Sequence, residues 1–231
     1  MQVPDSLPNH IGFIVDGNRR WAKELGKSAQ FGHKAGSDNL KKVIDYCIES
    51  GIPYVSAYVF STENWQRAEK EVSFLMKLTT DFMKKDLSEL HEKGVKVVHV
   101  GSRVPLSPKV LQAVDKAVEQ TKDNTNITIG LCFNYSGQVE IAEATQSIIR
   151  AGLEPEAVTP EVFEQYLYAP DIPPVDFVVR TSGEHRLSNF MLWRAAYAEL
   201  YFPDVKWPDF DQAAFTTALN EYASRQRRFG N

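Results

Sequence analysis

The sequence predicts an α/β fold in which a mainly parallel central sheet is covered by helices on both faces. Short apolar segments rich in β-branched and aromatic residues alternate along the chain with longer segments whose apolar residues recur at helical spacing. This alternation is typical of parallel sheets, because each parallel strand needs a crossover connection that covers a face. No internal repeat, low-complexity stretch or Gly/Ser linker interrupts the alternation, so we expect one domain over residues 1–231.

Five strands are predicted from the apolar segments at residues 11–15, 54–60, 95–100, 127–133 and 177–179. The segment 54–60 is typical, since its Tyr, Val and Phe residues favour strands. Residues 201–207 are expected to be extended as well.

The helices follow from apolar residues spaced along one face, beginning at Leu40. Gly51 ends this first long helix, as helix C-termini favour glycine, and residues 26–32 before it are interpreted as turns. Further helices are predicted at residues 71–93, 108–118 and 138–151, from residue 160 onward, at 190–200 and at 210–229. Ser107 and Thr159 each precede a proline, which is a favoured helix start.

Composition narrows the function. Lys and Arg total 26 and Asp and Glu total 30, a formal charge of −4, so we expect no nucleic-acid partner. Cys47 and Cys132 lie far apart inside apolar segments and are expected to be buried thiols rather than a disulfide or zinc site. The chain has no zinc-protease motif and no standard nucleotide-binding glycine loop. With no long apolar run and no signal-peptide pattern, a cytoplasmic protein is expected.

Polar residues follow four of the predicted strands, at residues 16–21, 61–67, 134–137 and 180–186. Ligands of open parallel sheets bind beyond the carboxyl ends of the strands, so we expect these segments to form one polar pocket.

Asp16 has two interpretations: it holds Mg²⁺ together with substrate phosphates, or it caps the helix that follows. The pocket's expected cations are arginines, whose planar forks bind phosphate; they are Arg19, Arg20, Arg67, Arg180 and Arg186. Each one alone could be a solvated surface arginine, but their shared place after strands favours a small polyanion such as a diphosphate. His33 lies at a predicted helix start, where a bound anion would be favourable, and its alternative interpretation is a helix-start histidine without a ligand.

The helix at 71–93 carries a broad apolar set that has two interpretations. Some of these residues, with one from the neighbouring strand, form either ordinary core or the wall of a tunnel for an apolar substrate tail; they are Val59, Phe74, Leu75, Met76 and Phe82. Spacing alone does not choose between core and tunnel.

Long segments of the chain closely resemble the cis-prenyltransferases, and the bacterial undecaprenyl diphosphate synthases are the nearest group. The matching segments are 10–22 (HIGFIVDGNRRWA), 31–36 (FGHKAG), 61–65 (STENW) and 180–190 (RTSGEHRLSNF). The resemblance continues through 197–202 (YAELYF) and 207–210 (WPDF) to 227–230 (RRFG).

The resemblance implies an α/β homodimer that condenses isopentenyl diphosphate with an allylic prenyl diphosphate. The product is a Z-configured polyprenyl diphosphate, either undecaprenyl diphosphate or a shorter chain, serving as a lipid carrier. Diphosphate is released, Mg²⁺ is the cofactor, and the product's release implies transient contact with a membrane.

The same resemblance assigns roles to individual residues. Asp16 corresponds to the essential carboxylate that engages Mg²⁺, and Glu199 to a second metal ligand acting across the dimer interface. Asn64 matches the residue assigned as proton acceptor, although an amide is a poor base and a relay through water or released diphosphate is expected. The allylic diphosphate segment comprises Gly17, Asn18, Arg19, Arg20, Trp21 and His33. The second substrate loop comprises Ser61, Thr62, Glu63, Trp65 and Arg67, and the isopentenyl diphosphate site comprises Arg180, Arg186, Leu187 and Ser188.

The chain departs from the family pattern at a few positions. Ala29 stands where many members have arginine, and Ala68 replaces a proline, which is expected to loosen its loop. Ser136 and Gln138 replace residues of a common Asn-Tyr-Gly-Gly-Arg pattern, and Val59 is bulkier than the usual alanine. Our hypothesis is that Val59 narrows the tunnel and favours a shorter product.

Three rival functions are weighed against this one. A non-catalytic partner subunit is disfavoured because Asp16, Asn18 and Asn64 are present. Irregular head-to-middle coupling is disfavoured because Arg180, Arg186 and Ser188 look intact. A phosphohydrolase would leave the long apolar helix without a role.

Overall fold

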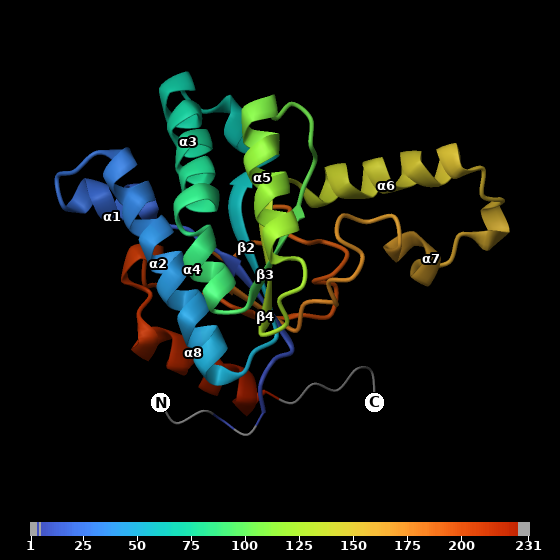
Figure 1. The fold of residues 1–231 in the computed structure, drawn as a ribbon. Helices are drawn as coiled ribbons and strands as arrows, with labels where there is room; N and C mark the ends of the chain where they lie inside the picture. Colours follow the sequence, from blue (N-terminus) through green and yellow to red (C-terminus); the bar gives the residue numbers. More distant parts are fainter. Residues whose placement is uncertain (1–3, 5, 226–231) are drawn as a thin grey trace.

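Six parallel strands form the centre of the fold in the computed structural model, which describes residue 4 and residues 6–225 (Figure 1). They are β1 (His10–Ile14), β2 (Tyr54–Ser61), β3 (Val95–Val100), β4 (Ile127–Tyr135), β5 (Phe177–Arg180) and β6 (Glu199–Tyr201). Their order across the sheet is β3-β4-β2-β1-β5-β6. The five predicted strands and their parallel pairing are confirmed, and β6 covers only the first residue of the segment expected to be extended.

Eight α-helices and three short 3₁₀ helices connect the strands within these residues. The α-helices are α1 (Asn18–Glu24), α2 (Ala29–Ser50), α3 (Glu69–Lys85), α4 (Leu87–Glu92), α5 (Pro108–Thr121), α6 (Gly137–Ala151), α7 (Pro160–Glu164) and α8 (Gln212–Ser224). The 3₁₀ helices are η1 (Thr62–Gln66), η2 (Pro155–Ala157) and η3 (Trp207–Asp209).

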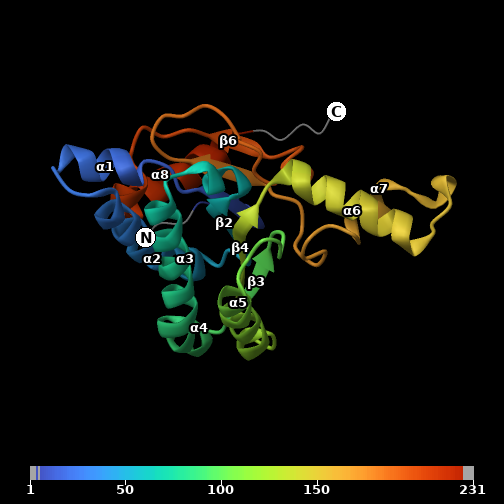
Figure 2. The same ribbon diagram turned by 90° about the horizontal axis from the view of Figure 1, so that it is seen from above.

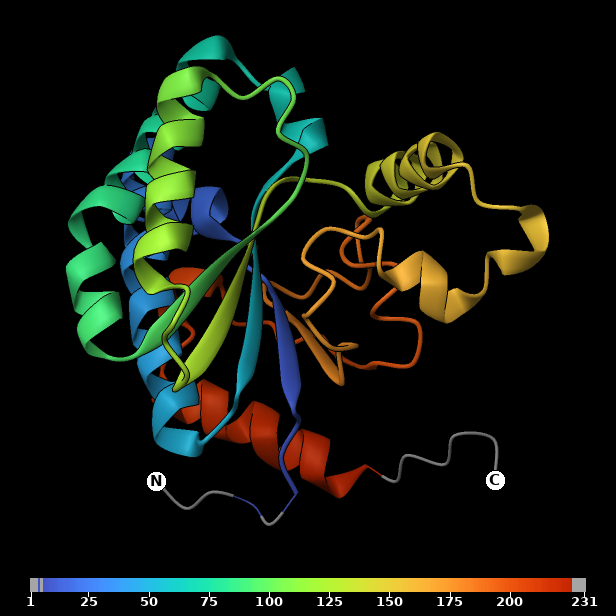
Figure 3. The same cartoon turned by 45° about the vertical axis from the view of Figure 1, so that its right-hand side comes forward.

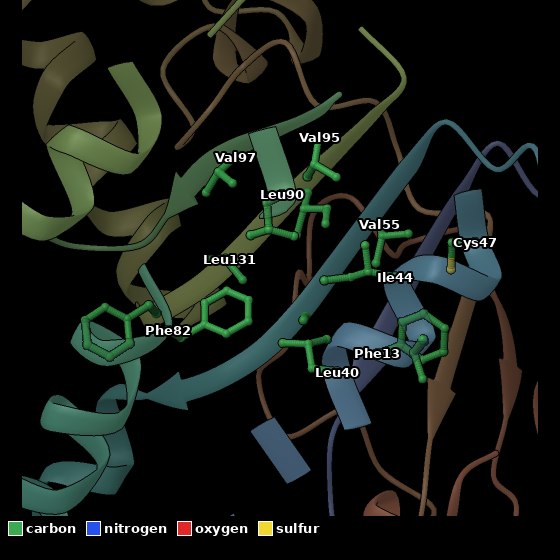
Figure 4. Close-up of a cluster of buried hydrophobic side chains, with 14 of the residues drawn as sticks. Phe13, Leu40, Ile44, Cys47, Val55, Phe82, Leu90, Val95, Val97 and Leu131 are labelled. Atoms are coloured by element: carbon green, nitrogen blue, oxygen red, sulfur yellow. The ribbon is translucent and has the colours of Figure 1, made fainter. Parts of the chain in front are cut away.

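The main hydrophobic core lies between one face of the sheet and α2, α3, α4, α5 and α8 (Figure 3). Figure 4 shows Ile44 and Leu40 of α2 directed toward Phe13 of β1 and Val55 of β2, with Phe82 of α3 further along. Burying such side chains contributes roughly 1.5–3 kcal/mol each. This packing keeps the sheet rigid under the site.

The second face carries a smaller core, which includes Tyr58, Val178 and Phe190. It is covered mostly by the irregular segment 166–198, while α6 and α7 extend away from the sheet as an arm (Figure 2). Helices therefore cover the first face, as predicted, while irregular chain takes their place over most of the second face. Cys47 and Cys132 are buried free thiols, also as predicted.

The helix predicted from Leu40 starts earlier, at Ala29, so the turn interpretation of residues 26–32 is wrong for its second half. The Oγ of Ser28 accepts a hydrogen bond from the amide of Phe31 and caps the helix. Gly32 lies inside α2 for packing: a Cβ there would be 2.1 Å from the carbonyl oxygen of Asn18, and one at Gly36 would be 2.3 Å from the Asn18 Oδ1. These glycines allow α1 to lie directly against α2.

The long helix predicted at 71–93 is two helices, α3 and α4, separated at Asp86. The Asp86 carboxylate accepts a hydrogen bond from the Lys41 Nζ of α2 at 3.0 Å. The break lets Phe82 before it and Leu90 after it both reach the core.

The helix predicted at 190–200 is wrong, because this segment consists of turns followed by β6. Ser188, Asn189 and Met191 have φ angles of 47°, 67° and 42°, in the left-handed region. Phe190 and Met191 are fully buried against the sheet, so long-range packing overrides the local helical pattern. The helix predicted at 210–229 is confirmed as α8 up to Ser224, and residues 226–229 lie outside the described residues, as does the RRFG match at 227–230.

Candidate active site

The carboxyl ends of β1, β2 and β5 open into one cavity of about 800 Å³. Ile14, the last residue of β1, pairs with Arg180 of β5, and Asp16 follows two residues later. Ser61 ends β2 on the other side. The residues that follow β1, β2 and β5 therefore meet in one polar cavity, as predicted. The segment 134–137 after β4, which was also predicted to line the pocket, does not line this cavity; only Gln138 of α6 does.

Asp16 does not cap α1, so that interpretation is wrong: Gly17 occupies the N-cap position, with φ 105°. The Asp16 Oδ2 accepts a hydrogen bond from the Arg180 Nη2 at 2.9 Å, and Oδ1 accepts one from the Gly17 amide at 2.7 Å. Burial raises the pKa of the Asp16 carboxyl, but the hydrogen bond and charge of Arg180, helped by Gly17 and Arg20, lower it below its ordinary value. Asp16 is thus an ionised carboxylate on the cavity wall.

Arg180 ends β5, organises that side of the cavity through its hydrogen bonds, and is only 4% exposed. Its Nη1 donates to the Arg186 carbonyl and to the Ser188 Oγ, both at 2.7 Å. Its Nε is buried and has no hydrogen-bond partner among the described residues. The buried guanidinium therefore links Asp16 to the 186–188 turn and retains one donor for an anion.

A second cavity of about 530 Å³ adjoins the first at Asp16 and is lined mainly by cations. The lysines Lys23 and Lys27, which the sequence analysis did not select, join Arg19, Arg20 and Arg67 there. Lys23 lies four residues after Arg19, one helical turn along α1, and this spacing was the available signal. Ala29 also lines this cavity, so an arginine at this position, as the family pattern leads one to expect, would face it.

The cations on the outer rim share a carboxylate. Glu184 Oε1 lies 2.7 Å from the Arg20 Nη1, and its Oε2 pairs with Arg186. Glu184 thus forms ion pairs with Arg20 of the cationic cavity and with Arg186 of the polar cavity, and both arginines are exposed.

His33 is buried at the base of the cavities, against Glu71. Its Nε2 lies 3.2 Å from the Glu71 Oε1, which also accepts a hydrogen bond from the Arg67 Nη1 at 2.9 Å. Burial lowers the pKa of His33, and the Glu71 carboxylate opposes this only in part. Glu71 is absent from the predicted site; nothing in the sequence distinguishes it from Glu69 in the same helical turn.

The loop after β2 is held by its own hydrogen bonds. The Asn64 Oδ1 accepts from the Ser61 amide at 3.2 Å, one half of a capping box around η1. The Trp65 indole donates to the Asn134 Oδ1 at 2.8 Å and packs edge-on against Phe60. Asn64 lines the large cavity while its amide oxygen is engaged in the loop.

A third cavity, small and apolar, lies between α2 and α3, with a volume of about 70 Å³. Val59, Leu75 and Phe82 line it, whereas Phe74 and Met76 do not. The three cavities share Val15, Asn18 and His33. Polar, cationic and apolar spaces therefore meet at one point.

The predicted site residues that line the polar or the cationic cavity are Asp16, Gly17, Asn18, Arg19, Arg20, His33, Ser61, Glu63, Asn64, Arg67, Arg180, Arg186 and Ser188. Tyr58, Asn189 and Leu192 line the polar cavity and were not predicted. The predicted residues Thr62 and Leu187 line none of the three cavities, nor does Trp65.

Two further predicted residues lie away from the cavities. Trp21 stacks on Phe31 with ring centroids 5.7 Å apart and donates to the Asp209 Oδ1. Glu199 begins β6, opposite Phe177, and its Oε2 accepts a hydrogen bond from the Arg225 Nη1 at 3.0 Å. Phe177 itself pairs with Ile11, so Glu199 lies toward the opposite end of the sheet from Asp16 of its own chain.

Within residues 6–225 no group of three or more His, Cys, Asp or Glu side chains is arranged to hold a metal ion. The helices of this same range include none with the length and apolar character that crossing a bilayer requires.

Comparisons with known proteins agree with this arrangement. A family model described as "Putative undecaprenyl diphosphate synthase" matches residues 14–230. Isoprenyl transferase 2 of Corynebacterium glutamicum is 47% identical over 100% of this chain and 98% of its own length. A trans,polycis-polyprenyl diphosphate synthase of Thermobifida fusca, described as (2Z,6E)-farnesyl diphosphate specific, is 47% identical over 99% of this chain and 83% of its own length.

Two solved structures share the fold over nearly the whole chain. Lavandulyl diphosphate synthase from Lavandula x intermedia, in complex with dimethylallyl diphosphate, has a TM-score of 0.92 and 32% identity, covering 97% of this chain and 99% of that one. A probable undecaprenyl diphosphate synthase from Campylobacter jejuni has a TM-score of 0.83 and 29% identity, covering 98% and 100%.

The fold, the cavities and these relatives define an α/β transferase of prenyl groups. The chain belongs to the cis-prenyltransferase family, as its motifs indicated.

Proposed function

We propose that the chain condenses isopentenyl diphosphate with an allylic prenyl diphosphate, forms a new Z double bond and releases diphosphate. The observation that carries this proposal is the meeting of the three cavities at Val15, Asn18 and His33. An allylic diphosphate needs an apolar space for its tail and a cationic space for its head, with the reacting carbon between them. The second diphosphate then has the polar cavity, with Arg180, Arg186 and Ser188 on its wall.

The residues present suit the chemistry of this reaction. The allylic C–O bond breaks with its electron pair leaving on the diphosphate, and Arg19, Arg20 and Arg67 stabilise the charge that develops there. The terminal alkene carbon of isopentenyl diphosphate attacks the allylic cation, which leaves a tertiary cation on the methyl-bearing carbon. A proton is then lost from the CH2 group on the diphosphate side of that carbon, and the new double bond forms between these two carbons. Because the Asn64 oxygen already accepts the Ser61 amide and an amide is a weak base, the proton passes to the released diphosphate or to water.

The donor set at Asp16 fits Mg²⁺. Mg²⁺ prefers oxygen ligands and is commonly bound by one or two carboxylates with substrate phosphates and waters. Asp16 is an ionised carboxylate between the polar and cationic cavities, within reach of a ligand in either one. Asp16 would hold the ion, which when bound supplies positive charge that stabilises the diphosphate leaving group.

A homodimer accounts for the position of Glu199. The strand register puts Glu199 level with Ile11, five residues before Asp16, so at about 3.3 Å per residue it lies about 16 Å or more from Asp16 of its own chain. Tyr197, two residues before β6, is 78% exposed. Together with Trp193 it lines a surface groove of about 710 Å³. A second chain covering this face would bury the groove and bring Glu199 toward a neighbouring site.

Mixing two inactive variants tests this arrangement. If Glu199 serves the partner's site, heterodimers of Asp16→Ala and Glu199→Ala chains contain one intact site, and mixing restores activity. Absence of recovery, with dimers present by analytical ultracentrifugation, would show that Glu199 has no role across the interface.

The function itself is tested by product mass. The protein is incubated with Mg²⁺, isopentenyl diphosphate and C10, C15 or C20 allylic diphosphates, and C15 comes first because of the specificity in the Thermobifida relative's name. Elongated products that disappear in Asp16→Ala and on chelation of the metal support the proposal.

The rivals have distinct results in the same assay. A branched product from an allylic diphosphate alone would identify irregular coupling, which the match to lavandulyl diphosphate synthase makes worth testing. Phosphate release without isopentenyl diphosphate would identify a phosphohydrolase, and no product with any starter would identify a non-catalytic subunit. Products that co-sediment with vesicles would support a lipid carrier released through transient membrane contact.

A further inference from the structure

Glu71 stands at the centre of a cluster of two arginines and one histidine that come from three different parts of the chain. Its Oε1 lies 2.9 Å from the Arg67 Nη1 and 3.2 Å from the His33 Nε2, and its Oε2 lies 3.9 Å from the Arg19 Nη1. Arg19 belongs to α1 and His33 to α2, while Arg67 directly follows η1. One carboxylate thus contacts all three segments around the cationic cavity.

The two arginines and His33, rather than Glu71, face the cavity. Arg19, His33 and Arg67 line the cationic cavity, and Glu71 lines none of the three that meet at the site. The Glu71 side chain is 13% exposed, against 60% for that of Arg19. A diphosphate in the cavity would therefore contact the cations from the side opposite Glu71.

We propose that Glu71 is a positioning residue, which ties the loop carrying Arg67 to α1 and α2 and holds Arg67 and His33 toward the diphosphate. This inference rests on the proposed function. A carboxylate shared by a guanidinium and an imidazole restricts both side chains, so less conformational freedom is lost when the ligand binds. It is also the only counter-charge that the structure shows for the buried His33 within residues 6–225.

Glu69 offers a matched control. Glu69 and Glu71 both lie in the first turn of α3 and interact alike with the helix dipole. Glu69 is exposed and has no ion pair or side-chain hydrogen bond among the described residues. A difference in diphosphate binding between Glu71→Gln and Glu69→Gln therefore measures the effect of the contacts that Glu71 makes with Arg19, His33 and Arg67.

Calorimetric binding of inorganic diphosphate, with steady-state kinetics of chain elongation, tests the proposal. In Glu71→Gln we expect diphosphate affinity to fall about tenfold, or about 1.4 kcal/mol, and KM for the allylic substrate to rise by a similar factor. KM for isopentenyl diphosphate and all constants of Glu69→Gln should stay within about twofold of wild type, a difference of less than 0.5 kcal/mol. Amide exchange of residues 61–68 should accelerate in Glu71→Gln alone.

The pH dependence supplies a readout that a purely structural role would not change. His33 faces Glu71, Arg67 and Arg19, and of these only the carboxylate raises the pKa of the imidazole. Removing that charge lowers the pKa of His33, so the imidazole loses its positive charge at a lower pH. As the pH is raised, diphosphate binding should therefore begin to weaken at a lower pH in Glu71→Gln than in wild type or Glu69→Gln.

Either of two results would overturn the proposal. Equal behaviour of the two variants would make Glu71 an ordinary helix-start residue, and tighter diphosphate binding in Glu71→Gln would make it a competitor for the cations. Both are read from diphosphate binding, with folding checked by circular dichroism. An inactive wild-type enzyme that still binds diphosphate would count against the proposed function alone.

Discussion

Replacing Arg194 by methionine should strongly destabilise the protein, because Arg194 is the charged centre of the buried network beneath the 186–194 segment. The guanidinium is 5% exposed, and its Nη1 donates to the Glu140 Oε1 at 2.8 Å. Its other nitrogens donate to the carbonyls of Tyr168, Ala169 and Ile172. Methionine fills much of the same space but provides no donor for any of these acceptors.

The expected magnitude follows from the burial of the partner. Glu140 is 1% exposed and would keep only the Tyr135 hydroxyl and the Tyr168 amide as donors. Removing one member of a buried ion pair typically costs about 3–5 kcal/mol, a large part of the roughly 5–15 kcal/mol that stabilises a domain. Arg103, paired with Asp115 at 2.8 and 2.9 Å but about half exposed, is the control, and Arg103→Met should cost about 0–1 kcal/mol.

Urea unfolding followed by circular dichroism at pH 7 measures both costs. The double variant Arg194→Met with Glu140→Met removes the stranded charge and should recover part of the loss, because apolar residues often replace a buried pair without penalty. Similar small losses for Arg194→Met and Arg103→Met would refute the reasoning.

Three further predictions concern the loop, the first strand and the apolar pocket. Ala68→Pro should raise the free energy of unfolding by about 0.4–1 kcal/mol in urea melts, since Ala68 already has φ −54° and Arg67 before it is extended; a loss of stability would contradict this. Burial lowers the pKa of His10 to about 4, so the unfolded chain binds a proton that the folded protein does not, and stability should fall by up to about 3 kcal/mol as the pH drops from 6.5 toward 4. Urea melts across this range should show a shallower fall in His10→Gln, and equal slopes would exclude the effect. Val59→Ala should enlarge the apolar pocket and lengthen the product by mass analysis, and unchanged lengths would remove Val59 as a determinant.

Sequence reasoning succeeded where local pattern and tertiary structure agree. The strands before Asp16 and Ser61 are apolar because both faces of the sheet are covered, so their carboxyl ends could be located from the sequence. The pocket followed, because parallel strands bring those ends to one edge.

Sequence reasoning failed where long-range contacts determine the backbone conformation. The apolar residues at 190–200 have a helical pattern, but Phe190 and Met191 are anchored against the sheet and the backbone turns to reach it. Gly32 resembles a turn residue, although its role is to let α1 approach α2. Neither contact leaves a signal near it in the sequence.

Glu71 and Glu199 show the same limit at the level of the site. An acidic residue at a helix start is expected on general grounds, so the contacts that distinguish Glu71 from Glu69 appear only in the folded chain. Glu199 lies in a matching motif, but its distance from Asp16 of its own chain becomes visible only in the strand register.

The close contact between α1 and α2 has a mechanical consequence for a growing hydrocarbon chain. With Gly32 and Gly36 pressed against Asn18, these two helices behave as one rigid wall of the apolar pocket. The opposite wall is α3, which ends at Lys85, while α4 begins after Asp86. If the proposed substrate tail enters this pocket of about 70 Å³, the pocket has to widen as the tail lengthens, and each added unit performs work against the packing of α3. Elongation would then stop when that work exceeds the free energy gained by burying five more carbons. The resistance of α3 to displacement would in that case set the length of the product.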